Sequence, residues 1–172
     1  APTFAPTCAP TPAPTPAPTP APTPTPTPAP TPTPGPTPDR RNEVEKIISA
    51  EIPSFQLGPS QIKALNWLAF DDPANLDFVD VTPDELLERF VMALLYFSTG
   101  GENWADSSGF VSASSVCSWN EAIVCDPTVV ESYPMVVEIR FSENNLRGQL
   151  PTELGLLTSL ENLFLGKLAT AS

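Results

Sequence analysis

The pattern that most constrains the fold is a set of apolar residues that recurs after 24 residues. The first set is Val136, Ile139 and Phe141, and the second set is Leu160, Leu163 and Leu165. Side chains two positions apart in a β-strand point to the same face, so each set predicts a short strand with one buried face. Recurrence at a fixed period of this length is typical of repeat proteins, in which each unit buries its apolar face against the next.

The stretch from residue 136 to residue 157, VVEIRFSENNLRGQLPTELGLL, fits a longer motif. The residues that fill L-x-x-L-x-L-x-x-N-x-L and the extension after it are Val136, Ile139, Phe141, Asn144, Leu146, Gly148, Leu150, Pro151, Leu154, Gly155 and Leu157. The stretch resembles a plant-type leucine-rich repeat, which implies the start of an α/β solenoid in which the amide of Asn144 satisfies backbone groups. The alternative is a lone strand followed by a loop and a helix in an ordinary α+β domain.

The segment CSWNEAIVC, just before the repeat, resembles the cysteine-containing N-terminal cap of plant-type leucine-rich-repeat proteins. The residues that match the cap motif C-x-W-x-G-V-x-C are Cys117, Trp119, Val124 and Cys125. The loop is one residue longer than the motif, and Glu121-Ala122 stands where the motif has Gly. The resemblance implies a Cys117–Cys125 disulfide and hence an oxidising compartment, whereas the alternative is two separate buried thiols.

The first 38 residues contain 17 Pro and 11 Thr and carry no charge. Proline at every second residue fixes φ and removes amide donors, so this tract predicts a solvated polyproline-II stalk rather than a helix or sheet. The alternating Thr residues suit O-glycosylation. A ligand for an SH3-type domain is the weaker alternative, because such grooves usually require a nearby Arg or aromatic residue.

Two amphipathic helices are expected after the stalk. The segment RNEVEKIISAEI places Val44, Ile47, Ile48 and Ile52 on one helical stripe, and Pro53 ends it. The segment PSQIKALNWLAF predicts a second helix, with Ser60 as its N-cap and with Ile62, Leu65 and Leu68 facing inward.

The third helix is expected within VTPDELLERFVMALLYFSTGG. Thr82 should cap it, Pro83 occupies the first helical position, and Glu85 completes a capping box. Gly100 and Gly101 should end it. Apolar residues surround much of its circumference, so we expect burial on most sides. We also expect Trp67, Trp104 and Trp119 to pack in the core or the cap.

These patterns divide the chain into five segments. They are a Pro/Thr-rich stalk at 1–38, a helical acidic lead-in at 39–81, the N-terminal cap of the repeat at 82–134, the first repeat at 135–158 and a partial second repeat at 159–172. The second repeat departs from the motif after Gly166. A solenoid generally needs about three repeats, so we expect a piece of a longer array; a shifted reading frame near Gly166 and a degenerate repeat protein are the alternatives.

The charge and composition argue against several classes of function. The formal net charge of −12 repels nucleic-acid phosphates and anionic lipid headgroups. The chain has no His, and only two of its Cys are close together, so we expect no metal site and no cofactor. The acidic stretch FDDPANLDFVDVTPDE lacks the spacing of a calcium loop and is expected to be solvated. No catalytic residues and no membrane span are predicted, since the longest apolar run is FVMALLYF.

The sequence therefore indicates a non-catalytic recognition module, similar to receptor-like, cell-surface leucine-rich-repeat proteins such as those of diatoms and other microalgae. The side chains expected on its concave face are Glu138, Arg140, Ser142, Glu143, Asn162 and Phe164. The resemblance implies a protein, peptide or glycan partner, bound mainly by repeats absent from this sequence. We expect an extracellular or cell-surface location, with any membrane anchor upstream of Ala1. The alternative is a structural cell-wall or matrix O-glycoprotein whose Pro/Thr-rich tract is a spacer.

Overall fold

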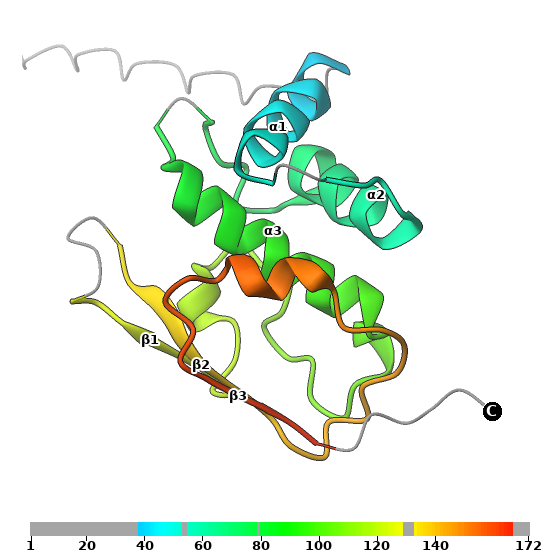
Figure 1. The fold of residues 1–172 in the computed structure, drawn as a ribbon, viewed down its shortest axis with the longest axis vertical. Helices are drawn as coiled ribbons and strands as arrows, with labels where there is room; N and C mark the ends of the chain where they lie inside the picture. The colour runs from blue at the N-terminus through cyan, green and yellow to red at the C-terminus, as the bar shows by residue number, and fades with distance from the viewer. Residues whose placement is uncertain (1–37, 53–54, 79, 129–132, 167–172) are drawn as a thin grey trace, which may run out of the picture. The chain divides into compact units, whose positions relative to one another are not determined.

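The computed structural model describes residues 38–52, 55–78, 80–128 and 133–166. Within these ranges the protein is a small α/β domain of three α-helices and an open, three-stranded mixed sheet (Figure 1). The predicted stalk, apart from Pro38, and residues 167–172 of the predicted second repeat lie outside the described residues.

The first two helices pack through the apolar stripes that the sequence suggests. Helix α1 spans Pro38–Glu51, and α2 spans Pro59–Asn66 before continuing as a π-helical turn, Trp67–Asp71. In α1, Val44 and Ile48 are fully buried. In α2 and its π-helical extension, the prediction is confirmed for Leu65 and Leu68 but is wrong for Ile62, which is 39% exposed. Ile62 lies beside the face that Ala64 and Leu65 bury, so it remains in solvent.

The predicted N-cap of α2 is also wrong. Gly58 is the N-cap, and no side chain caps this helix. Pro59 occupies the first helical position, where its fixed φ suits the start of a helix, so Ser60 already lies inside the first turn.

Helix α3, Pro83–Ser98, confirms the predicted start and end. The Thr82 hydroxyl accepts a hydrogen bond from the Glu85 amide at 3.2 Å. At the other end, Gly100 adopts a left-handed conformation with φ of 66°, which ends the helix. Ten consecutive residues, Leu86 to Leu95, are buried. Helices α1 and α2 pack on one side of α3, and the sheet lies on the other (Figure 1).

The sheet has the strand order β1-β2-β3, formed by Ile123–Asp126, Met135–Phe141 and Asn162–Leu165. Strands β1 and β2 are antiparallel, with an irregularity between Val124 and Cys125. Strands β2 and β3 are parallel, and Ile139 pairs with Leu163 while Phe141 pairs with Leu165. Paired residues of β2 and β3 are therefore 24 residues apart in the chain, which is the spacing at which the apolar pattern recurs.

One hydrophobic core joins the helices to β1, β2 and the short 3-10 helix η4, Thr152–Leu156, that follows them. The packing roles predicted for Trp67, Trp104 and Trp119 are confirmed, since each is less than 8% exposed. A disulfide joins Cys117 in the 3-10 helix η3, Val116–Ser118, to Cys125 in β1, as the cap resemblance implies. Such bonds are typical of proteins from oxidising compartments.

Candidate functional site

The solvent-facing side of β2 and β3 carries four polar or aromatic side chains, which we call the open sheet face: Glu138, Arg140, Asn162 and Phe164. Because Ile139 and Phe141 are buried, the alternation of a strand sends Glu138 and Arg140 to the opposite side. Phe164 pairs with Arg140 across the two strands and is 51% exposed. Arg140 also forms an ion pair with Glu138. The face therefore offers an aromatic ring beside an ion pair and a neutral amide.

The predicted framework residues lie mostly beneath this face. Those that are buried are Val136, Ile139, Phe141, Asn144, Leu146, Pro151, Leu154 and Leu157. Leu150, Leu160 and Leu165 are half-buried against the core. Leu163 is 39% exposed because β3 is the end strand of the sheet and has a neighbour on one side only. Gly148 and Gly155 are exposed.

Asn144 connects the turn after β2 to the loop that precedes the disulfide. Its side-chain oxygen accepts a hydrogen bond from the Asp106 amide at 2.6 Å, and its side-chain nitrogen donates to the Asp106 carbonyl at 2.9 Å. The partner is backbone, as predicted for Asn144, but it belongs to a segment 38 residues earlier in the chain. Asn144 is thus a structural residue rather than part of the open sheet face.

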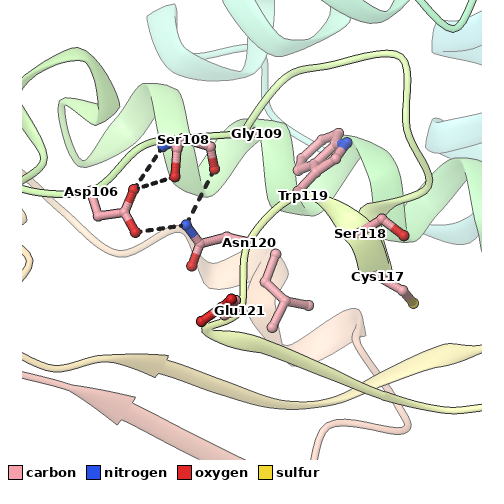
Figure 2. Close-up of a pocket in the computed structure, with 9 residues that line it drawn as sticks. Asp106, Ser108, Gly109, Cys117, Ser118, Trp119, Asn120 and Glu121 are labelled. Carbon is pink, nitrogen blue, oxygen red and sulfur yellow. Dashed lines mark hydrogen bonds between the residues drawn. The ribbon is translucent and has the colours of Figure 1, made fainter.

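A pocket of about 590 Å³ lies on the loops around the disulfide (Figure 2). At one end, the carboxylate of Asp106 accepts hydrogen bonds from the Ser108 amide, the Ser108 hydroxyl and the Asn120 side chain. These bonds, with the Ser108 hydroxyl first, hold the pKa of Asp106 below its usual value. Cys117 and Ser118 lie at the other end (Figure 2).

The polar groups of this pocket maintain its own loops. The Asn120 side chain also donates to the Ser108 carbonyl and accepts from the Ala122 amide, while the indole of Trp119 donates to Ser114. Asp106 is charged and already hydrogen-bonded, which suits a structural role better than acid–base chemistry. We therefore favour the open sheet face over this pocket as the functional site.

A buried ion pair joins Arg89 of α3 to Asp72, and sequence reasoning missed it. Arg89 donates two hydrogen bonds to the Asp72 carboxylate, at 2.6 Å and 2.5 Å, and two more to backbone carbonyls of Ser112 and Ser114. The expectation that the whole acidic stretch is solvated is therefore wrong at Asp72, which is 7% exposed. The carboxylate is buried because it neutralises a guanidinium that α3 carries into the core.

Glu88 is a second buried ionisable residue that sequence reasoning missed. It is 4% exposed, and its carboxylate accepts a hydrogen bond from the Val136 amide at 2.9 Å. The sequence does carry a signal for both residues, because LLERFVMALL sets Glu88 and Arg89 inside a run that is otherwise apolar. A helix buried on all sides must find partners for any charge within that run.

Two further observations concern metals and membranes. Among the described residues, no group of three or more His, Cys, Asp or Glu side chains is arranged to hold a metal ion. Within the same ranges, no helix combines the length and the apolar character needed to cross a bilayer.

Comparisons of this chain with protein-family models, with curated proteins and with solved structures found no match.

Proposed function

We propose that this chain is a non-catalytic recognition module, consisting of the N-terminal cap and first repeats of an extracellular leucine-rich-repeat protein. The observation that carries the proposal is the parallel pairing of β2 and β3, because partners such as Glu138 and Asn162 differ by the period of the sequence motif. That spacing is what stacked repeats require, since equivalent residues of successive repeats lie side by side. The Cys117–Cys125 disulfide supports placement outside the cell.

The proposed binding site is the open sheet face. An exposed ring beside a guanidinium suits partners that combine an apolar group with hydrogen-bond acceptors, such as peptides and glycans. Four side chains cover much less than the roughly 800 Å² per partner of a standard interface. We therefore propose that most of the affinity comes from further repeats outside this sequence, while the present residues form one end of the surface.

The first experiment tests the repeat. Sequencing the transcript beyond the codon for Ser172 should reveal in-frame segments that repeat the β2 and β3 pattern every 24 residues. A transcript that shows no such segment would contradict the proposal. The cell-wall glycoprotein with a Pro/Thr-rich spacer would then become the better interpretation.

The second experiment tests the site on the chain itself. A displayed peptide library and a glycan array would be probed with the oxidised, full-length chain. Ligands selected in this way should lose about tenfold in affinity with Phe164→Ala or Arg140→Ala, because truncating an aromatic or Arg side chain in an interface often has a large effect. Both side chains are more than half exposed, so neither change should affect folding.

The matched control is Phe70→Ala, because Phe70 is 40% exposed and belongs to the helical extension of α2, Trp67–Asp71, rather than to the sheet. This variant should bind the selected ligands as the wild type does. Ligands that bind equally to all three variants would place the site elsewhere.

A further inference from the structure

A hydrogen bond joins the middle of α3 to the beginning of β2. The Glu88 carboxylate accepts it from the amide of Val136, the second residue of β2, at 2.9 Å. Glu88 is 4% exposed, and Val136 is fully buried. The bond therefore attaches the central strand of the sheet to the central helix, 48 residues apart in the chain, through a carboxyl group with little access to bulk water.

The groups that surround Glu88 are acidic or neutral. A cavity of about 150 Å³ borders it and brings Glu51 from the end of α1 and Asp84 from the first turn of α3 to the same space. Glu85 lies one turn earlier on α3, and Tyr133 precedes β2. The rest of the cavity wall consists of Leu87, Met135, Leu156, Leu157 and Thr158. No basic side chain is among the described residues that line this cavity.

The nearest cation in the sequence cannot neutralise Glu88. Arg89 directs its guanidinium to Asp72 and lies against the rings of Trp67 and Trp119. The pKa of Glu88 is raised from a usual 4.5 to about 7. Burial is the largest cause; the hydrogen bond from the Val136 amide opposes it, and the charge of Glu85 adds to it. Burial and the nearby carboxylates, Glu88 first among them, also raise the pKa of Tyr133, so its phenol stays neutral.

The direction of the pH effect follows from these shifts. We call the arrangement in which buried Glu88 is bonded to Val136 the closed arrangement. Between about pH 4.5 and pH 7, Glu88 keeps its proton in this arrangement but would lose it in water, so low pH favours the closed arrangement. This stabilisation decreases as the pH rises through that interval, and a charged carboxylate then favours an arrangement in which water reaches it.

We propose that Glu88 is a proton-controlled latch: its protonated form holds the start of β2 against α3, and its deprotonated form releases that segment to water through the adjoining cavity. This inference is independent of the recognition function. It concerns the attachment of the strand that carries Glu138 and Arg140.

The test is amide hydrogen exchange by NMR on the oxidised, full-length chain. The protection factor of the Val136 amide, which corrects for the intrinsic pH dependence of exchange, should fall about tenfold between pH 6 and pH 8 in the wild type. The Glu88→Gln variant keeps an acceptor oxygen for Val136 but cannot ionise. In this variant the protection factor of the Val136 amide should stay constant between pH 6 and pH 8. The control Glu43→Gln removes an exposed carboxylate from α1 and should behave as the wild type does.

Three results would overturn the latch. The Val136 protection factor could be constant in the wild type, it could fall equally in Glu88→Gln, or the Leu65 amide of α2 could lose protection in parallel, which would indicate global unfolding. If Glu88→Gln fails to fold, the carboxyl carbon of Glu88 can be titrated by NMR in the wild type. A midpoint near 7 supports the latch, and a midpoint near 4.5 excludes it.

Discussion

At the scale of single residues, the most constrained charge is the guanidinium of Arg89. It is 3% exposed and donates to both oxygens of Asp72. Its central carbon also lies 5.3 Å from the ring centroid of Trp67 and 5.0 Å from that of Trp119. Two carbonyls from residues 112 and 114 complete its hydrogen bonds. Arg89 thereby ties α3 to Asp72, just after the extension of α2, and to the loop before the disulfide.

Removing the partner of Arg89 should be strongly destabilising. Asp72→Asn leaves a buried guanidinium without a countercharge, and we expect the free energy of unfolding to fall by roughly 3–5 kcal/mol. Urea denaturation followed by circular dichroism measures the loss. Asp71→Asn changes the adjacent, exposed carboxylate and is the control. Equal stability of the two variants would show that the ion pair is dispensable.

At the scale of elements, the two helix starts show what local sequence can and cannot indicate. Thr82, Pro83 and Glu85 form a complete start signal, and α3 begins there. Ser60 carries only part of such a signal, and α2 begins two residues earlier, with Gly58 as its N-cap and Pro59 in the first helical position. A capping residue acts through one local hydrogen bond, so its effect can be tested in isolation.

Replacing Thr82 by Ala removes the hydrogen bond to the Glu85 amide and should lower the free energy of unfolding by about 1 kcal/mol. The matched variant Ser60→Ala should change it by less than about 0.5 kcal/mol, because Ser60 caps nothing. Thermal unfolding of both variants under the same conditions provides the comparison. A larger effect at Ser60 would contradict the observed start of α2.

The loop after β2 approaches the end of α3 closely at Gly148. Its φ is 115°, and a Cβ atom there would lie 2.3 Å from the carbonyl oxygen of Ser98. Gly148→Ala should therefore cost on the order of 1–3 kcal/mol. Gly155→Ala is the control, because no atom lies within 4 Å of a Cβ at that position. Denaturant midpoints of the two variants should differ clearly, and equal midpoints would show that this loop can shift freely.

At the scale of the whole molecule, the disulfide and the shared core bring together segments that the sequence suggests are separate. Residues of α1, α2 and α3 contribute to the same core as β1 and β2, so residues 39–81 and 82–134 pack together rather than apart. The Cys117–Cys125 bond attaches the loop that contains Trp119 to the edge strand β1.

Replacing both cysteines of the disulfide by Ser should lower the free energy of unfolding by about 2.5 kcal/mol, as estimated from the chain entropy of a short loop. Thiol titration of the unfolded, unreduced chain should find one thiol, from Cys8, and three after reduction. A Cys8→Ser variant should give none before reduction. Three thiols in the unreduced wild-type chain would contradict the bond.

The sequence by itself indicated the elements that depend on local chemistry. The apolar recurrence at 24 residues predicted the strands β2 and β3, and Thr82 and Gly100 marked the ends of α3. The burial of the three Trp residues was also expected, and the resemblance to a leucine-rich-repeat cap implied the disulfide. Each of these depends on neighbours in the chain or on a motif of fixed spacing, so the order of residues is sufficient to reveal it.

Only the tertiary structure decided the partners of the buried charges. A periodic pattern shows that Glu88 and Arg89 lie within a buried helix, but it does not show what faces them. The partner of Glu88, Val136, lies 48 residues later in the chain, and the partner of Arg89, Asp72, lies 17 residues earlier. Packing of the core brings each partner into contact. Electrostatic interactions in a core act across space rather than along the chain, so they depend on how the helices and the sheet pack together.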